Sequence, residues 1–269
     1  MFSPWYAWAR RRGPADPLNH CALNVVLYGR GGKRWALTER GRGAVARDAH
    51  TLCIGRSVLS WDGAALTIDI DEVTAPVPSR LRGRVRIEPA AIETRVRTLD
   101  TAGRHRWSPI APCARAAVEF ASPSRRWSGP AYFDTNDGDA PLERDFVQWH
   151  WCRAPLADGT VVIYEAARRD GTATNLAMRY DTKGGVLDFE PPPPVRLPRT
   201  RWGIERPTRA DGPARVVRTL EDAPFYSRSV LATTMFGEPA AAIHESLSLD
   251  RFAAPWVQAM LPFRIPRRG

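Results

Sequence analysis

The sequence predicts an all-β protein, built from antiparallel strands as a sandwich or an up-and-down barrel. Three observations predict this class. Short segments alternate between apolar and polar residues, as a strand with one buried face requires. Gly-Gly and Asp-Gly turn signals separate these segments at short intervals. Helical periodicity is scarce along the chain, which leaves many short strands joined by tight turns.

Nine segments carry the strand pattern. It is clearest at Ala65–Ile70, which reads ALTIDI, and at Leu81–Ile87, where an arginine occupies every second position. Because alternate side chains of a strand point to opposite faces, the second of these segments should have one hydrated face. The other expected strands are Ala22–Tyr28, Ile92–Leu99, Val161–Ala166, Asn175–Tyr180, Arg215–Leu220, Ser229–Thr234 and Ala241–Leu249.

Two segments could divide the chain into domains. Thr135–Pro141 is polar and rich in turn-forming residues, and it splits the expected strands nearly evenly. Pro191–Pro194 is a stiff polyproline stretch that could act as a spacer. We prefer the first segment as the boundary. It gives domains of residues 1–144 and 145–269, with the prolines as a connection inside the second domain.

The composition restricts the class of protein. The 269 residues, of which 43% are hydrophobic, suffice for one large β domain or two smaller ones. No run approaches the ~20 apolar residues of a membrane-spanning helix, and the N-terminus lacks the pattern of a secretory signal. We therefore expect an intracellular protein that is soluble or peripheral to a membrane. Four cysteines lie far apart without metal-ligand spacing, so no metal site is expected.

The net charge is +10, and arginine carries almost all of it, since Lys33 and Lys183 are the only lysines. Such a surface suits an anionic membrane or a nucleic acid. The basic residues are dispersed and form no nucleic-acid-binding motif, so we expect no nucleic acid partner. Arg10–Arg12, close to Trp5 and Trp8, is a candidate for contact with an anionic membrane surface. The alternative is an N-terminal arm folded against a domain.

Two short motifs place a titratable group beside an aromatic ring. His105-Arg106-Trp107 begins an expected strand, and Tyr132-Phe133-Asp134 ends another, before an expected turn at Asn136–Gly138. Residues i and i+2 of a strand share a face, so each pair lies together. This suits a reaction through a carbocation. A buried aspartic acid stays protonated and can act as an acid, aromatic rings stabilise the cation, and a histidine can orient a water and accept its proton.

Each motif also has an ordinary structural interpretation. A Tyr-x-Asp at the end of a strand is often a turn cap, and a His-x-Trp at the start of a strand is often core packing. Trp127, Trp149, Trp151 and Tyr226 could line an apolar substrate pocket, or they could belong to the core of a barrel. The residues make the chemistry feasible without selecting it.

The other histidines are weaker candidates. His150 lies between Trp149 and Trp151, so it should point away from both rings. A surface position is the simplest interpretation of His244. No nucleotide-binding, flavin-binding or serine-hydrolase fingerprint is present, so no cofactor is expected.

Longer segments of the chain carry a resemblance to a known family. They are Phe2–Arg12 (FSPWYAWARRR), Asp16–Gly29, Arg34–Gly41, Ala131–Phe146 (AYFDTNDGDAPLERDF), Trp149–Arg153 and Ala223–Ser229. In this order they resemble the carotenoid 1,2-hydratase (hydroxyneurosporene synthase) family of phototrophic bacteria, and they span nearly the whole chain.

The resemblance implies a fold of two lipocalin-like β domains packed together. It also implies a reaction, the hydration of the C1–C2 double bond of an acyclic carotene such as neurosporene or lycopene, without a cofactor. The acidic residue of the family falls on Asp134 with Tyr132 beside it, and the family's His-x-Trp word falls on His105 and Trp107. The expected partners are the carotene, drawn from the cytoplasmic or photosynthetic membrane, and the membrane surface itself.

Two rival functions remain open at this stage. A fold of this kind could serve a carrier that binds a carotenoid or another lipid without converting it. It could also serve a polyene cyclase, in which Asp134 would be exposed or ion-paired. The preferred carotene, the number of hydrated ends and the oligomeric state are also left open by the sequence.

Overall fold

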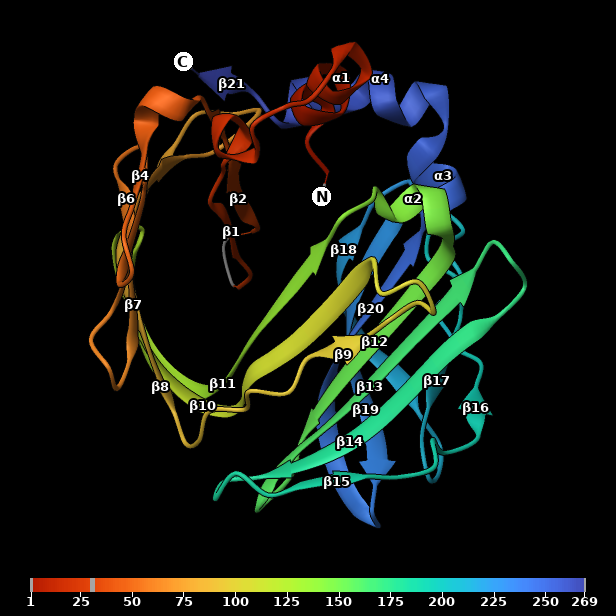
Figure 1. The fold of residues 1–269 in the computed structure, drawn as a ribbon. Coiled ribbons are helices and arrows are strands. Elements are labelled where there is room, and N and C mark those ends of the chain that lie inside the picture. The colour runs from red at the N-terminus through yellow and green to blue at the C-terminus, as the bar shows by residue number, and fades with distance from the viewer. Residues whose placement is uncertain (1, 30–31, 269) are drawn as a thin grey trace. The chain divides into compact units, whose positions relative to one another are not determined.

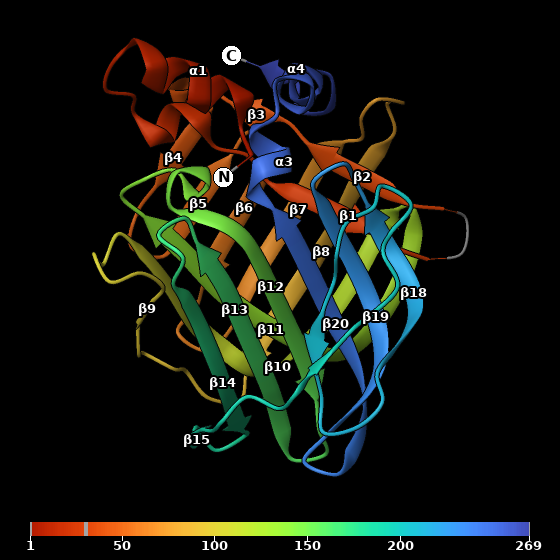
Figure 2. The same ribbon diagram turned by 90° about the vertical axis from the view of Figure 1, so that its right-hand side faces the viewer.

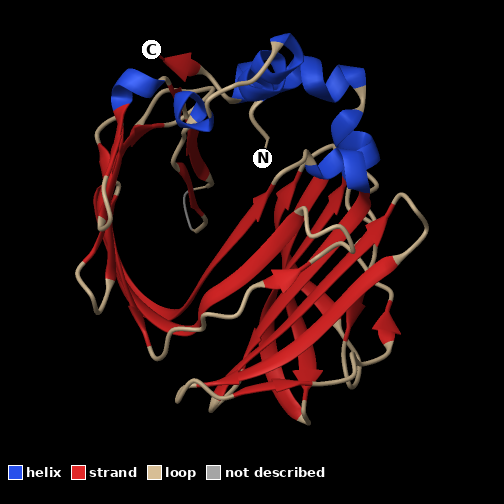
Figure 3. Ribbon diagram, in the orientation of Figure 1, coloured by secondary structure: helices blue, strands red, loops and turns tan. Residues whose placement is uncertain are grey.

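The computed structural model describes residues 2–29 and 32–268 (Figure 1). Strands dominate, and helices are confined to short segments (Figure 3). Neighbouring strands of the large sheets pair in antiparallel fashion. Over the described residues, the hydrogen-bonded order of neither large sheet closes on itself. The fold is therefore all-β and lipocalin-like, as the sequence predicts, with open sheets instead of closed barrels.

The chain forms two compact units, each assembled from separate stretches of sequence. The first comprises Met1–Pro89, Arg115–Gly129 and Gln258–Gly269, and the second comprises Ala90–Ala114 and Pro130–Val257. Strands β10 (His105–Ser122) and β11 (Ser124–Gly138) contribute to both units.

The expected division at residues 144 and 145 falls inside the second unit. The turn expected at Asn136–Gly138 is also not there, because these residues are the last part of β11. The Asn, Asp and Gly residues of this segment favour turns, but here the ladder with β10 holds them extended.

The first unit contains short strands, two one-turn 3-10 helices and two α-helices. Its elements are α1 (Pro4–Arg12), η1 (Pro17–His20), β1 (Asn24–Leu27), β2 (Arg34–Leu37), β3 (Glu39–Arg40), η2 (Arg42–Ala44), β4 (Val45–Arg47), β5 (Thr51–Ile54), β6 (Ser57–Trp61), β7 (Leu66–Val73), β8 (Arg80–Pro89), most of α4 (Pro255–Arg264) and β21 (Arg267–Arg268). The sheet has the order β11-β10-β8-β7-β6-β5-β4, and β9 (Arg97–Thr98) of the second unit also pairs with β10.

The alternation seen in β8 separates a hydrated face from a core face. The arginines bond to acids on β7, with Arg80 on Asp71 and Arg84 on Asp69. Leu81, on the opposite face, is fully buried in a core cluster with Val25, Ala36, Ile70, Val118 and Phe120. A Cβ added at Gly83 would lie 2.6 Å from the Phe120 ring, so only glycine fits between these strands.

A buried carboxylate ties together the two ends of the first unit. Glu39 is 1% exposed and accepts hydrogen bonds from Ser3, His20 and Arg267. Arg267 lies on β21, which pairs in parallel with β3. Because a buried carboxylate is tolerated only with such partners, Glu39 fixes both terminal segments at one place.

The second unit is built on one sheet with the order β15-β14-β13-β12-β20-β19-β18 (Figure 2). Its elements are β9, α2 (Leu142–Asp145), β12 (Phe146–Pro155), β13 (Gly159–Arg168), β14 (Ala173–Asp181), β15 (Val186–Asp188), β16 (Pro194–Val195), β17 (Thr208–Arg209), β18 (Arg215–Asp222), β19 (Tyr226–Met235), β20 (Glu238–Ser248) and α3 (Leu249–Ala253).

The sheet of the second unit has two different faces. On one face, a core of apolar side chains includes Cys152, Ile163, Leu231 and Ala242, which pack against the segment that contains Leu197 and Ala210. Because strand side chains alternate, the odd-numbered residues of β12 point to the other face. That face carries the candidate site.

Most expected strands are confirmed, but Ile92–Leu99 is wrong, because only Arg97–Thr98 is a strand there. The Glu93 carboxylate accepts the backbone N–H groups of Thr94 and Arg95. These local bonds offer the backbone an alternative to a ladder.

Candidate active site

The two motifs meet at one carboxyl oxygen. On β10, the indole Nε1–H of Trp107 donates a hydrogen bond of 2.7 Å to Oδ2 of Asp134 on β11. The hydroxyl of Tyr132, two residues before Asp134 on the same face of β11, donates to the same oxygen at 3.0 Å. Two neutral donors thus fix the orientation of the Asp134 side chain. Among the described residues, no ion pair to Asp134 is found.

The surroundings of Asp134 favour its protonated form. Burial raises the pKa of the carboxyl above its usual range, and the nearby Glu245 carboxylate raises it further, while the hydrogen bonds from Trp107 and Tyr132 act in the opposite direction. A carboxyl without a cationic partner in a low-dielectric place keeps its proton to higher pH. Asp134 therefore has the properties of a general acid.

Aromatic rings surround this carboxyl group. The Trp151 ring lies 5.1 Å from that of Tyr132, and the Tyr164 ring lies 5.1 Å from that of Trp107. Trp149 meets Tyr164 edge to face at 5.6 Å. The indole N–H groups of Trp149 and Trp151 are buried without a hydrogen-bond acceptor in the protein. The site therefore combines one acid with several π-faces and with unpaired N–H donors.

His105 begins β10 on the same face as Trp107, as predicted. Its ring contacts Asp145 and Phe146, however, and not Asp134. Its Nε2 lies 2.8 Å from Oδ2 of Asp145, and its ring packs edge to face on Phe146. Its backbone N–H donates to Asp100. The side chain is 2% exposed. Although burial raises the pKa of Asp145, hydrogen bonds from His105 and Arg104 bring it below its ordinary value. His105 and Asp145 thus form a hydrogen-bonded pair at the end of β10.

The four predicted substrate-binding residues lie in different places. Trp149 and Trp151 join the group around Asp134, whereas Trp127 belongs to the first unit, where its exposed ring stacks on Phe120. Tyr226 lies on β19, where the Arg228 guanidinium sits 6.0 Å from its ring. It is paired with Leu247, which is itself paired with Trp149.

Two functional candidates, Tyr164 and Glu245, were not apparent from the sequence. Tyr164 is directly paired with Trp151, and its hydroxyl donates to Asn136 at 3.2 Å. Glu245 is paired with Trp151 from the other side and forms an ion pair with Arg228. Each lies in a strand segment with the expected alternation. This pattern predicts which face of the sheet the side chain occupies, but not which side chains of other strands lie beside it. The order of strands in the sheet places both residues beside Trp151, and contacts of this sheet face with Trp107 and Tyr132 bring them near Asp134.

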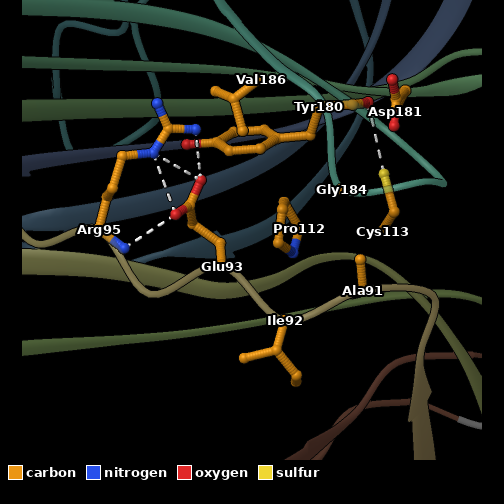
Figure 4. A pocket seen from close by; sticks show the side chains of 10 residues that line it. All are labelled: Ala91, Ile92, Glu93, Arg95, Pro112, Cys113, Tyr180, Asp181, Gly184 and Val186. Atoms are coloured by element: carbon orange, nitrogen blue, oxygen red, sulfur yellow. Dashed lines mark hydrogen bonds and ion pairs between the residues drawn. The ribbon is translucent and has the colours of Figure 1, made fainter.

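A small pocket opens elsewhere in the second unit (Figure 4). It has a volume of about 80 Å³, and Glu93, Arg95, Cys113 and Tyr180 are among its lining residues. The Arg95 guanidinium is bonded to the Glu93 carboxylate, and Cys113 donates its S–H to the Tyr180 carbonyl at 3.5 Å. On β10, Cys113 is six residues from Trp107, or roughly 20 Å at 3.3 Å per residue. The pocket is therefore separate from the Asp134 group.

Comparison with known proteins identifies the family. The whole chain, residues 1–269, matches the family described as carotenoid hydratase CrtC. The chain belongs to this family. It is 57% identical to the acyclic carotenoid 1,2-hydratase of Thiocapsa roseopersicina and 49% identical to that of Rubrivivax gelatinosus. Both alignments cover all of this chain, and 67% and 68% of those relatives. The Rhodobacter capsulatus hydratase is 43% identical, with 95% of its length covered.

Among solved structures, two crystal structures of CghA are similar in fold. One, described with Sch210972, has a TM-score of 0.50 at 11% identity, and the other has a TM-score of 0.51 at 12% identity. Each alignment covers 82% of this chain and 81% of the other. Identities this low support the all-β fold of this carotenoid hydratase family member and nothing about its chemistry. Over the described residues, no helix has the length and apolar character that a membrane crossing requires.

Proposed function

We propose that this chain adds water to the C1–C2 double bond of an acyclic carotene. The observation that carries the proposal is the Asp134 carboxyl, which is held by two neutral donors among aromatic rings and has a raised pKa. Protonation of an unactivated alkene requires an acid that stays protonated in a place with little water. The family to which the chain belongs, and the names of its relatives, support the same reaction.

The proposed reaction has two steps. Asp134 gives its proton to C2, and the electron pair of the double bond forms the new C–H bond. The tertiary cation left at C1 lies against the rings of Trp107 and Tyr132, which attract it through cation–π interactions of about 2 kcal/mol or more in a desolvated site. A water then forms the C1–O bond and loses a proton. Because both steps need only a proton and a water, the proposed reaction uses no cofactor.

Within the proposed reaction, His105 was predicted to steer the water, and this role stays a prediction. Its pairing with Asp145 supports a role in fixing the start of β10, next to Trp107. Neurosporene and lycopene remain the proposed substrates, since both end in the open-chain double bond that this chemistry requires. Trp149 and Trp151 are proposed to line the site, and the roles of Trp127 and Tyr226 as substrate-binding residues stay predictions.

We also propose that the protein takes its substrate from an anionic membrane surface. Helix α4 exposes Trp256, Met260 and Phe263, and Phe263 is 80% exposed. At spacings of four and three residues these side chains share one helical face. In α1, Trp8 is exposed and the helix ends in Arg10–Arg12, whereas Trp5 donates to the Ile265 carbonyl and so belongs to the folded unit. Exposed aromatic residues beside arginines favour the interface of an anionic bilayer.

An incubation with lycopene or neurosporene in liposomes, in H₂¹⁸O and without oxygen or added cofactor, tests the proposal. We expect each converted end group to gain one water whose oxygen comes from the solvent. Asp134→Asn protein serves as the inactive control. If the folded protein extracts the carotene and returns it unaltered, the carrier function replaces the proposed one. If a ring forms without added water, a cyclase replaces it.

A further inference from the structure

The hydration step needs a base, because the water that adds to C1 must lose a proton. We propose that Glu245 is this general base and that it faces the reacting water from β20. The inference rests on the proposed function and deepens it.

Glu245 lies on the same sheet face as the aromatic group of the site. It is the direct antiparallel partner of Trp151 on β12. Side chains at directly paired positions have Cβ atoms about 4.5–5.5 Å apart. The Trp151 ring lies 5.1 Å from the Tyr132 ring, and the Tyr132 hydroxyl bonds to Asp134. Glu245 is thus a neighbour of Trp151, whose ring contacts the Tyr132 ring beside Asp134.

The Glu245 carboxylate forms an ion pair with an arginine. Arg228, its partner on β19, places Nη2 at 2.6 Å and Nε at 2.8 Å from Oε1 of Glu245. Hydrogen bonds of this kind, between a guanidinium and a carboxylate, are assisted by the charges of both groups. Both contacts are to Oε1, and over the described residues no hydrogen bond to Oε2 is found. One oxygen is thus bound to the arginine while the other is available to accept a proton.

A second observation points to a water beside this carboxylate. Trp151 is 8% exposed, and its Nε1–H is buried without an acceptor in the protein. A buried N–H group without a partner is unfavourable, so a polar ligand at this place is stabilising. Water is the smallest ligand that accepts this bond and also presents a proton to Glu245.

His105 is less suited to the same task. Its Nε2 is bonded to Asp145, and a Cβ added at Gly138 would lie 2.9 Å from its Nδ1. One ring nitrogen is therefore committed to a carboxylate and the other faces the backbone of β11. Within this proposal His105 acts as a positioning residue for β10 in place of steering the water, since both of its ring nitrogens face protein groups.

The proposed step balances in protons and electrons. As the water oxygen forms its bond to C1, Oε2 of Glu245 takes one proton of the water, and the tertiary alcohol leaves as the neutral product. Asp134 is then a carboxylate and Glu245 is protonated. Transfer of the proton from Glu245 back to Asp134 restores the starting state.

The experiment measures how the cation is divided between capture by water and return to the alkene. In D₂O, a return in which C2 loses its original hydrogen and keeps the added deuteron leaves deuterium in the recovered carotene, whereas capture gives alcohol. The ratio of deuterium exchange to hydration therefore reports the base separately from the acid. We expect Glu245→Gln to lower hydration about 100-fold, within the usual range for a general base, and to raise the ratio at least tenfold.

Glu165→Gln is the matched control. Glu165 lies on β13 of the same sheet and also forms an ion pair with an arginine, Arg209. It should leave the ratio unchanged. Glu245→Asp, which retracts the carboxylate by one methylene, should give an intermediate ratio and covers the case in which Glu245→Gln folds poorly.

Two results would overturn the assignment. One is a wild-type ratio in both folded Glu245 variants. The other is a raised ratio in His105→Gln together with an unchanged ratio in Glu245→Gln. If wild-type protein neither hydrates nor exchanges, the proposed function itself fails, and the role of Glu245 fails with it.

Discussion

The indole N–H of Trp107 and the carboxyl of Asp134 are joined by a hydrogen bond of 2.7 Å between β10 and β11. This bond gives Trp107 two roles in the proposed reaction. Its N–H fixes the acid, and its ring stabilises the cation that the acid creates. Because the same side chain serves both steps, the position of the proton donor is fixed relative to the ring that stabilises the cation. The predictions below test the parts of this arrangement.

Asp134→Asn should abolish hydration while leaving the fold intact. Asparagine keeps the shape of the side chain and can still accept the bonds from Trp107 and Tyr132 through its oxygen, but it cannot supply a proton. General acids contribute about 10²–10⁴-fold to a rate, so a loss of at least 100-fold is expected in the liposome assay. Turnover within tenfold of wild type, with circular dichroism unchanged, would remove Asp134 from its assigned role.

The same variant should be relatively more stable than wild type at alkaline pH. The folded-state pKa of Asp134 is raised by burial above its unfolded value. The stability that this group contributes is therefore present at low pH and is lost as pH rises through the folded pKa. Asparagine does not ionise, so the difference in melting temperature between variant and wild type should grow with pH. A difference that stays constant as the pH rises from about 4, near the pKa of an unfolded aspartate, would contradict the raised pKa.

Trp107→Phe should lower the rate and move its alkaline limb to higher pH. The Trp107 N–H lowers the pKa of Asp134, against burial and the Glu245 carboxylate, which raise it. Without this donor the acid stays protonated to higher pH but is weaker, so the maximal rate falls, about tenfold by our expectation for one lost donor. Tyr132→Phe, which removes the other donor to Oδ2, provides the comparison and should move the limb in the same direction. A limb that moves to lower pH in both variants would contradict this view.

The sequence contains the strand alternation and the two motifs, and both predict what the structure shows. Alternation in Leu81–Ile87 correctly assigns the hydrated arginines to one face of β8, because that pattern depends only on the period of a strand. The pairing of Tyr132 with Asp134 follows from the same rule. The bond between Trp107 and Asp134 does not, since it depends on the register of β10 against β11.

Where the structure differs from the sequence-based expectation, the position of the residue depends mostly on contacts between segments far apart in the sequence. His244 was assigned to the surface, yet it is 1% exposed, because the segment that carries Pro207 covers its strand. The helix α4 was not expected, since Pro262 lies inside it and proline usually ends a helix. Glu245 became a candidate only when the strand order placed it beside Trp151.

Phe263→Ser should weaken binding to anionic vesicles. Phe263 is the most exposed of the large apolar side chains on α4, so its loss removes apolar contact with the bilayer and leaves the core untouched. Flotation with phosphatidylglycerol vesicles should show a decrease of about fivefold or more, which corresponds to roughly 1 kcal/mol of lost apolar transfer. Val77→Ser, at another exposed apolar position of the first unit, is the control and should bind like wild type. Equal binding of all three proteins would exclude the α4 face as the contact.

Acidification should destabilise the protein through two buried histidines. Burial lowers the pKa of His150 to about 4, and burial together with the charge of His150 lowers that of His244 to about 3. Both are neutral in the folded state, where His150 contacts Ser246 and His244 contacts the Pro207 carbonyl. In the unfolded chain both bind protons near pH 6.5. Their contribution to stability is therefore present above pH 6.5 and is lost as pH falls from there toward 4.

Urea unfolding between pH 7 and 4.5 measures this effect. With two extra protons bound by the unfolded chain, the free energy of unfolding should fall by up to about 2.7 kcal/mol per pH unit below pH 6. His150→Asn combined with His244→Gln should flatten this slope, although the double variant starts from lower stability. His50→Gln, at an exposed position, should keep the wild-type slope. If the double variant and the wild type lose stability in parallel, the two histidines do not titrate as their burial requires.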